Sequence, residues 1–196
     1  MSTQRRNGVQ VESSLGARGV LIIRFSNPPV NALSSELRSQ LAKAVNDAHS
    51  RHDVRAIVLF GASSKGFFSS GADISEFQDF NPSTWTSKQG FRDEYEVFES
   101  GPKPVVAAID GVCFGGGLEL AMACSARVCT PRSSFSLPEL RLGIIPGLGG
   151  TQRLPRLIGF AKGLQAMIFS ETLDSQNAVD SGLVDLLVKS GAAQVE

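Results

Sequence analysis

The sequence predicts an α/β protein whose strands pair mainly in parallel. Short apolar runs, such as Val20–Phe25 and Val105–Ile109, alternate with segments whose apolar residues recur at helical spacing. Such alternation is typical of α/β layers with a parallel sheet. The 196 residues are 42% hydrophobic and include no low-complexity tract or obvious repeat, so they can bury one substantial core. We therefore expect one domain over residues 9–190, with flexible ends at residues 1–8 and 191–196.

The first strand and the first helix have the clearest local signals. The strand over Val20–Phe25 cannot continue through Asn27–Ala32, because the two prolines there lack N–H donors. Ser34 or Ser35 can then cap a helix that ends near residues 49–52. One face of this helix is predicted to be buried, because apolar residues recur on it at helical spacing: Leu37, Leu41, Val45 and Ala48.

The remaining elements follow from the same patterns of spacing. We expect strands at Arg55–Gly61, Val105–Ile109, Ala126–Thr130, Ser134–Leu137 and Leu183–Val188. We expect helices starting at Ala72, within Asn81–Ser100, and over Leu118–Cys124, Thr151–Ile158, Ala161–Phe169 and Ser175–Ser181.

Charge and apolar patterning argue against two classes of partner. The chain has 19 Lys and Arg residues and 19 Asp and Glu residues, giving zero formal net charge. This balance removes the usual electrostatic basis for binding nucleic acid or a membrane surface. No uninterrupted apolar run of about 18 residues is present, so we expect no membrane-spanning helix. The N-terminal residues lack the apolar core of a secretory signal, and the C-terminus is not a peroxisomal tripeptide address.

Cysteine and histidine usage gives no metal site. Cys113, Cys124 and Cys129 have no C-x-x-C spacing and lie among apolar or small residues, so we expect buried, reduced thiols. His49 and His52 lie near the predicted end of a helix without a matching cluster of cysteines or carboxylates. A solvated helix end explains this pair better than metal ligation does.

Two glycine-containing loops, Ser70–Asp73 and Gly115–Gly117, each lead into a predicted helix. Glycine lets a backbone approach a ligand closely, and the first N–H groups of a helix have no intrahelical partner. Two such N–H groups aimed at one point would stabilise negative charge on a carbonyl oxygen. Taken alone, the glycines are better explained by close packing of a helix on a strand. Neither nucleotide-binding glycine motif, G-x-G-x-x-G or G-x-x-x-x-G-K-[ST], occurs.

Two carboxylates lie in apolar surroundings close to these loops. Glu119 falls within the predicted helix Leu118–Cys124, and Glu139 follows Pro138 in an apolar turn. Glu119 could instead face solvent at a helix start, and Glu139 could form a surface ion pair with Arg141. Together, however, the two acids offer a general acid and a general base whose pKa values burial and mutual repulsion would tune toward neutrality.

Four stretches together carry a family resemblance: Asn27–Leu33, Phe68–Ile74, Val105–Cys124 and Leu137–Gly159. On these motifs the chain resembles the enoyl-CoA hydratase/isomerase (crotonase) family over about residues 9–190. The amino-acid sequence of Leu137–Gly159 is most similar to the hydratase part of peroxisomal multifunctional β-oxidation proteins. The resemblance implies a crotonase-like (ClpP/crotonase) spiral of β-β-α turns and an acyl-CoA thioester substrate. It implies no metal and no separate cofactor, since coenzyme A is part of the substrate.

The resemblance also implies roles for individual residues. The N–H groups of Ala72 and Gly116 would hold the thioester oxygen. Glu119 would activate a water for attack at C3 of a trans-2-enoyl-CoA, and Glu139 would deliver the proton to C2. The implied substrate and CoA contacts come from the two loops and from one lysine: Lys65, Ser70, Ala72, Asp73, Ile74, Ser75 and Gly116.

Family members that stand alone are longer and end in a helical segment that covers the acyl pocket and builds trimers. The present sequence stops just after Leu183–Val188, so we expect it to lack most of that segment. Exposed apolar surface would follow, and activity would then be reduced or depend on a homo-oligomer or another partner chain that covers the pocket.

Other readings stay open at this stage. A single-acid relative would shift a double bond as a 3,2-enoyl-CoA isomerase, keeping an acid at Glu139. A truncated, inactive form would only bind acyl-CoA or a partner chain. An RNA-binding relative would need a lysine-rich helix face, but residues 35–50 offer only Arg38 and Lys43. The resemblance places the protein in peroxisomes, and the cytoplasm is the alternative.

Overall fold

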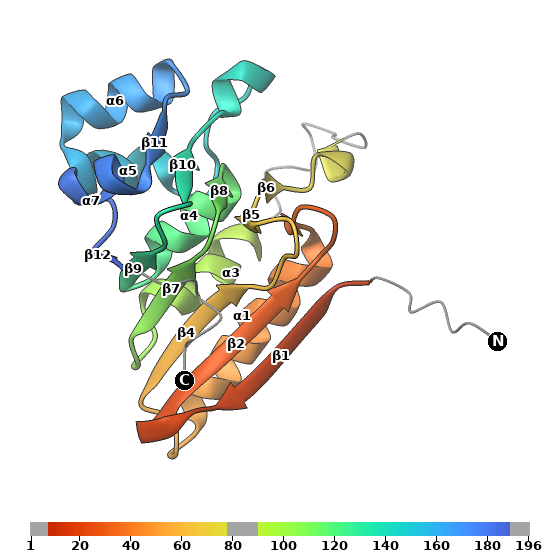
Figure 1. Cartoon of the computed structure of the whole chain (residues 1–196). Helices are drawn as coiled ribbons and strands as arrows, with labels where there is room; N and C mark the ends of the chain where they lie inside the picture. The colour runs from red at the N-terminus through yellow and green to blue at the C-terminus, as the bar shows by residue number, and fades with distance from the viewer. Residues whose placement is uncertain (1–7, 78–89, 189–196) are drawn as a thin grey trace.

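A six-stranded sheet and a four-stranded sheet form the framework of this chain, with helices packed against them (Figure 1). The computed structural model describes residues 8–77 and 90–188. The predicted flexible ends, residues 1–8 and 191–196, lie outside these ranges except for Gly8.

The larger sheet contains the long apolar runs of the sequence. Its strands, in spatial order, are β1 (Gln10–Leu15), β2 (Val20–Ser26), β4 (Ala56–Gly61), β7 (Val105–Ile109), β9 (Ala126–Cys129) and β12 (Leu186–Leu187). Every neighbouring pair in this sheet is parallel except β1 with β2. The predicted parallel α/β architecture is therefore confirmed.

Strand β1 was not predicted, because its sequence is polar and it buries little. Most of its side chains are exposed, and it is held to β2 by an antiparallel register that runs from Gln10 opposite Ser26 to Leu15 opposite Leu21. Backbone pairing of this kind leaves no apolar pattern in the sequence.

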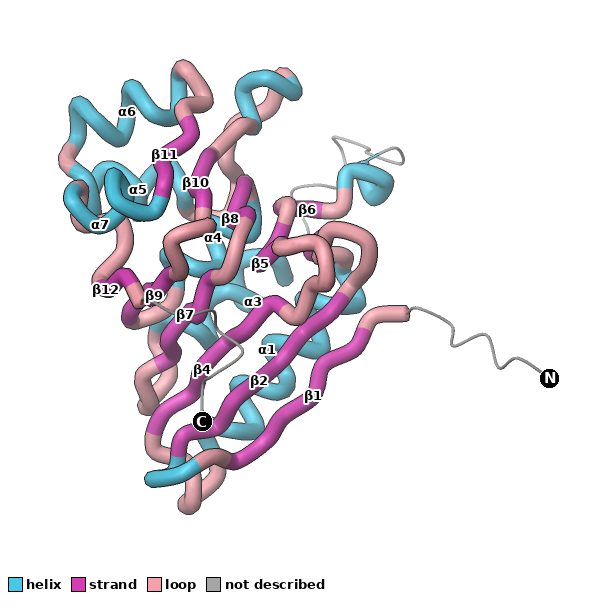
Figure 2. Tube along the Cα trace, in the orientation of Figure 1, coloured by secondary structure: helices cyan, strands magenta, loops and turns pink. Residues whose placement is uncertain are grey.

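The smaller sheet is made of short strands that follow those of the larger one. It is ordered β11 (Thr172–Asp174), β10 (Ser134–Ser136), β8 (Val112–Phe114) and β5 (Phe67–Ser69). Thus β4 leads to β5, β7 to β8, and β9 to β10, which places one strand in each sheet per repeat (Figure 2). This succession of paired strands and a helical segment is the predicted β-β-α spiral. A two-stranded pair, β3 (Ala32–Leu33) with β6 (Gly71–Ala72), lies beside it.

Helix α1 (Ser35–Ser50) has the predicted cap and the predicted buried face. The hydroxyl of Ser34 accepts the N–H of Leu37 at 3.3 Å. The four apolar residues predicted at helical spacing are all buried: Leu37, Leu41, Val45 and Ala48. In Figure 1, α1 and α3 (Gly90–Glu99) lie against the same face of the larger sheet.

The central helix, α4 (Gly116–Ala123), is buried along its whole length. The last three helices, α5 (Gly150–Ile158), α6 (Phe160–Ile168) and α7 (Ser175–Asp180), gather at one end of the molecule (Figure 2). Buried Arg127 ties the end of the chain to α4, because its guanidinium donates to the carbonyls of Leu183, Ala121 and Cys124. Its Nη2 also lies 3.2 Å from a carboxylate oxygen of Asp185.

Two predicted elements need correction. The helix predicted to start at Ala72 is strand β6 followed by a short 3-10 turn, η2 (Ile74–Phe77), in which Glu76 accepts the N–H of Ser35 from the neighbouring α1. The predicted strand Leu183–Val188 pairs only at Leu186–Leu187, because its first residues are held by Arg127. The helix predicted within Asn81–Ser100 is confirmed as α3, and residues 81–89 lie outside the described ranges.

The cysteine prediction is confirmed, whereas the histidine prediction is only half right. All three cysteines are buried, and none of them forms a disulfide bond. His52 is exposed, but His49 packs against α3 with its Nε2 3.0 Å from the carbonyl of Val97. Within residues 8–77 and 90–188, no cluster of three potential metal ligands occurs. No helix in those ranges is long and apolar enough to cross a membrane.

Candidate active site

The start of α4 is shaped by three consecutive glycines. Gly115 adopts a positive φ of 50°, a conformation that a residue with a Cβ rarely takes. A Cβ on Gly117 would lie 2.6 Å from the Cβ of Ser69, so the helix can approach β5 only because no side chain is present there. The glycine run therefore allows the close helix–strand packing that was one of its two predicted explanations.

The same close approach brings the two predicted N–H donors together. A Cβ on Gly116 would lie 3.3 Å from the backbone nitrogen of Ala72, and one on Gly71 would lie 3.3 Å from the nitrogen of Gly116. Gly116 is the first residue of α4, so its N–H has no intrahelical partner. The backbones of the two glycine loops thus meet at one place.

Ser69 supports this meeting point and was missed by the sequence analysis. Its hydroxyl donates to the carbonyl of Asn31 at 2.7 Å and accepts the N–H of Gly71 at 3.1 Å. Ser69 is fully buried. A serine in a Ser/Gly-rich loop has no distinctive pattern, so its role emerges only from the contacts.

Glu119 is buried and firmly held. Its side chain projects from the first turn of α4, and the residue is 2% exposed. Its Oε1 accepts the N–H groups of Leu148 and Gly150, each at 2.8 Å. Burial raises the pKa of this carboxyl, while the two N–H donors and the positive charge of Arg153 oppose the rise. Glu119 therefore does not face solvent, and its ionised form has dedicated hydrogen-bond donors.

Glu139 is buried with one carboxyl oxygen unpaired among the described residues. It begins the 3-10 turn η3 (Glu139–Leu142) and is 7% exposed. Its Oε2 is inaccessible and has no hydrogen-bond partner among the described residues. Burial raises its pKa, a hydrogen bond from its own backbone opposes the rise, and the negative charge of Glu119 adds to it, so that the pKa is about 7. The alternative ion pair with Arg141 is not formed, because Arg141 donates to the carbonyl of Ser170 at 3.1 Å.

The two carboxyls lie beside the paired backbone nitrogens. A Cβ on Gly115 would be 3.2 Å from Oε1 of Glu139, and one on Gly150 would be 2.9 Å from Oε1 of Glu119. Glu119 has two backbone donors that favour its ionised form, whereas Glu139 has an unpaired buried oxygen among the described residues and a pKa of about 7. Unlike environments of this kind are how an active site obtains a base and an acid from the same residue type.

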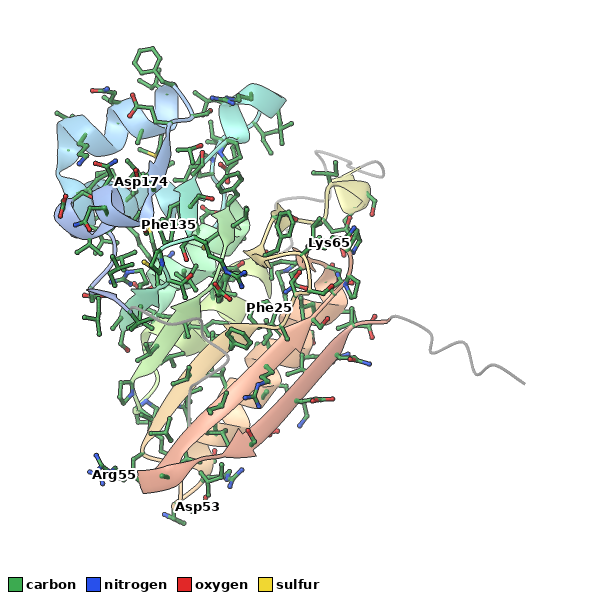
Figure 3. All side chains as sticks on the ribbon, viewed as in Figure 1. Phe25, Asp53, Arg55, Lys65, Phe135 and Asp174 are labelled. Carbon is green, nitrogen blue, oxygen red and sulfur yellow. The ribbon has the colours of Figure 1, made fainter. Side chains whose placement is uncertain are left out.

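The predicted coenzyme A contacts lie on the loops beside this centre. Lys65 is exposed on the turn between β4 and β5, and Figure 3 shows its position. Ser70 donates its N–H to the carbonyl of Val30 at 3.0 Å. Asp73 accepts the N–H and hydroxyl of Ser75, at 3.0 and 2.7 Å. Ile74 is 65% exposed. The Asp73 carboxylate therefore shapes its own loop.

The loop that holds Glu119 was quoted in the sequence analysis as part of a motif but was given no role there. Leu148 and Gly150 act through their backbone N–H groups, which no side-chain pattern reveals. The doubled glycine at 149–150 was the one available signal, because glycine permits a close backbone approach.

Comparisons with known proteins show which sequences this chain is similar to. The family model for enoyl-CoA hydratase/isomerase matches residues 16–196. A peroxisomal fatty acid beta-oxidation multifunctional protein of Arabidopsis thaliana is 46% identical over 193 residues, which cover 95% of this chain and 26% of that protein. A probable enoyl-CoA hydratase of Bacillus subtilis is 42% identical over 179 residues, covering 90% of this chain and 69% of that protein.

Solved structures show the same fold. The crystal structure of an enoyl-CoA hydratase from Bacillus anthracis matches with a TM-score of 0.82 and 33% sequence identity, covering 91% of this chain and 70% of that chain. The present chain thus spans about a quarter of the length of the multifunctional relative and about two thirds of the hydratase structure.

Proposed function

Because the chain belongs to the enoyl-CoA hydratase/isomerase family, we propose that it hydrates the double bond of a trans-2-enoyl-CoA. The observation that carries this proposal is the contrast between the two buried carboxyls. Glu119 has two N–H donors on one oxygen, whereas Glu139 has a buried oxygen with no partner in the part of the chain that the structure describes. Adding water across a conjugated double bond needs one base and one acid at the same time.

The proposed reaction assigns each carboxyl one proton transfer. Glu119 takes a proton from a water molecule as the water oxygen forms a bond to C3. The π electrons of the double bond move toward the thioester, and C2 then takes the proton of Glu139. The product is a 3-hydroxyacyl-CoA. Glu119 ends protonated and Glu139 ionised, so one proton must pass back through solvent before the next turnover.

Negative charge that develops on the thioester oxygen needs its own stabilisation. We assign this to the N–H groups of Ala72 and Gly116, whose backbones meet beside the two acids. Rigid backbone donors of this kind do not need to reorient as charge develops, and removing one donor typically costs about 2.7–4 kcal/mol of transition-state stabilisation. The rest of the coenzyme A would lie along Ser70–Ser75, with Lys65 available to its phosphates.

The test is hydration of a trans-2-enoyl-CoA, followed by loss of its conjugated absorbance. In Glu119→Gln, the amide oxygen can still accept both N–H groups but cannot take a proton, so turnover should fall by about 10²-fold or more. Glu139→Gln should cause a similar fall. Glu12→Gln changes an exposed acid on β1 and should leave turnover unchanged. The hydratase proposal fails if wild type and both active-site variants are equally inert.

A second candidate reaction is 3,2-enoyl-CoA isomerisation, which the pKa of Glu139 favours. With a value of about 7, this carboxyl is partly ionised at neutral pH and could move a proton between carbons by itself. Products from 2-enoyl-CoA and 3-enoyl-CoA should be measured side by side. Isomerisation that survives Glu119→Gln while hydration is lost would assign both reactions to this site.

We also propose a place for the chain in peroxisomal fatty-acid β-oxidation, with the cytoplasm as the alternative. The support is the printed names of multifunctional relatives from Arabidopsis thaliana and Cucumis sativus, which are peroxisomal and glyoxysomal proteins. A fluorescent fusion of the protein should co-localise with a peroxisomal marker, and a diffuse cytoplasmic signal would contradict this placement.

A further inference from the structure

The orientation of Glu119 depends on a loop that precedes α5. The N–H groups of Leu148 and Gly150 both bind the same carboxylate oxygen, Oε1, at 2.8 Å. Since a base must be aimed closely at the water that it activates, any movement of this loop moves the base.

Arg153 hydrogen-bonds to the backbone of this loop. It lies in the first turn of α5, and its Nη1 donates to the carbonyl of Leu148 at 2.7 Å. Gly149 has a φ of 99°, and a Cβ there would lie 2.2 Å from Nη1 of Arg153. The guanidinium therefore occupies the space that a side chain at position 149 would need. The backbone N–H of Arg153 also donates to the carbonyl of Gly149, at 2.9 Å. The loop is therefore closed around this one side chain.

Helix α3 fixes the other side of the guanidinium. Nε and Nη2 of Arg153 donate to the two carboxylate oxygens of Glu99, at 3.3 and 2.6 Å. Four residues earlier on the same helix, the hydroxyl of Tyr95 donates to the carbonyl of Gly116 at 3.2 Å. Residues four apart lie on one face of a helix, so one face of α3 contacts both the N-terminus of α4 and Arg153.

We propose that Arg153, oriented by Glu99, is a positioning residue that fixes the Leu148–Gly150 loop and thereby the base Glu119. The inference rests on the hydratase function proposed above. Arginine suits this task because its planar fork can bind a carbonyl and a carboxylate at fixed angles, which lysine cannot do. Arg153 does not touch the reacting atoms; it acts through the loop.

Arg153 also acts on Glu119 by its charge. The charged groups that face each other here are Arg153 from α5, which acts on Glu119, and Glu139 from η3, on which Glu119 acts. The cation lowers the pKa of Glu119. Loss of the cation should therefore make Glu119 protonate at higher pH, so the acidic limb of the pH–rate profile should move upward.

The test compares Arg153→Gln, Arg153→Lys and Glu99→Gln with a control, Arg156→Gln. Arg156 is exposed on the same helix, and among the described residues its guanidinium donates only to Gln152. We expect kcat to fall about 10-fold to 100-fold in Arg153→Gln, with little change in KM and with the acidic limb displaced to higher pH. Arg153→Lys should restore the position of that limb but only part of kcat. Glu99→Gln should lower kcat less, and the control should match wild type.

The outcome is separable from that of the proposed function. The carboxyl of Glu119 can be titrated by ¹³C NMR in protein labelled at glutamate carboxyls, with Glu119→Gln used to assign its resonance. If wild type does not turn over, an upward displacement of this titration in Arg153→Gln would still support the inference. An unchanged titration and an unchanged pH profile in folded Arg153→Gln would overturn it. If Arg153→Gln does not fold, kcat in Arg153→Lys and Glu99→Gln decides: a lower kcat in both variants supports the inference, and the wild-type kcat in both overturns it.

Discussion

Replacing Glu139 by glutamine should stabilise the folded protein at alkaline pH. Glu139 is 7% exposed and one of its oxygens has no partner among the described residues. Its pKa rises from an ordinary 4.5 to about 7 on folding. Between these values the folded protein binds more protons than the unfolded chain, so the stability contributed by this group declines as pH rises.

The magnitude follows from the same two values. Because one pKa unit is worth about 1.4 kcal/mol, an ionised Glu139 costs the folded state about 3 kcal/mol above pH 7. Solvent that reaches the site reduces this to about 2 kcal/mol. Glutamine has nearly the same shape and no charge. The free energy of unfolding of Glu139→Gln, relative to wild type, should therefore increase by about 2 kcal/mol from pH 5 to pH 8.

Urea unfolding followed by circular dichroism, at intervals from pH 5 to pH 8, measures this difference directly. Glu12→Gln provides the matched control, because that acid is exposed on β1 and its stability difference from wild type should not vary with pH. A difference between Glu139→Gln and wild type that stays flat over the whole range would refute the reasoning. This result would mean that Glu139 is solvated or paired in the folded protein.

Three further predictions concern catalysis and packing. The kcat/KM of hydration should fall as pH rises through about 7, because Glu139 must be protonated. It should also fall at low pH, where Glu119 becomes protonated. A profile that is flat from pH 6 to 9 would contradict the assigned roles. Gly150→Ala would place a Cβ 2.9 Å from Oε1 of Glu119, so kcat should fall about tenfold or more with KM nearly unchanged; wild-type kcat would show that the loop can yield. Gly117→Ala would place a Cβ 2.6 Å from that of Ser69, and thermal unfolding should show about 1–3 kcal/mol of destabilisation; an unchanged melting temperature would count against tight packing at this point.

The sequence identified the elements whose signal is local. The helical spacing of Leu37, Leu41 and Val45 predicted the buried face of α1, and all three are buried. The apolar run Val105–Ile109 predicted β7 with its observed bounds. Such patterns succeed because burial of one face repeats with the period of the element itself.

Elements held by partners that are distant in the chain escaped prediction. Strand β1 is polar and mainly exposed, and η2 is fixed in part when Glu76 caps a different helix at Ser35. Neither depends on the spacing of its own apolar residues. Their formation depends on neighbours that are distant in the chain, so a local pattern could not reveal them.

The candidate site divides in the same way. The sequence by itself determined that two acids, Glu119 and Glu139, lie in apolar surroundings near glycine-rich loops, because residue type and neighbours are local properties. The tertiary structure decided which acid has backbone donors from a distant loop. Glu119 receives N–H groups from Leu148 and Gly150, about thirty positions away, while Glu139 receives none on its buried oxygen from any described residue. Backbone donors carry no side-chain signature, so only the folded chain could show where they point.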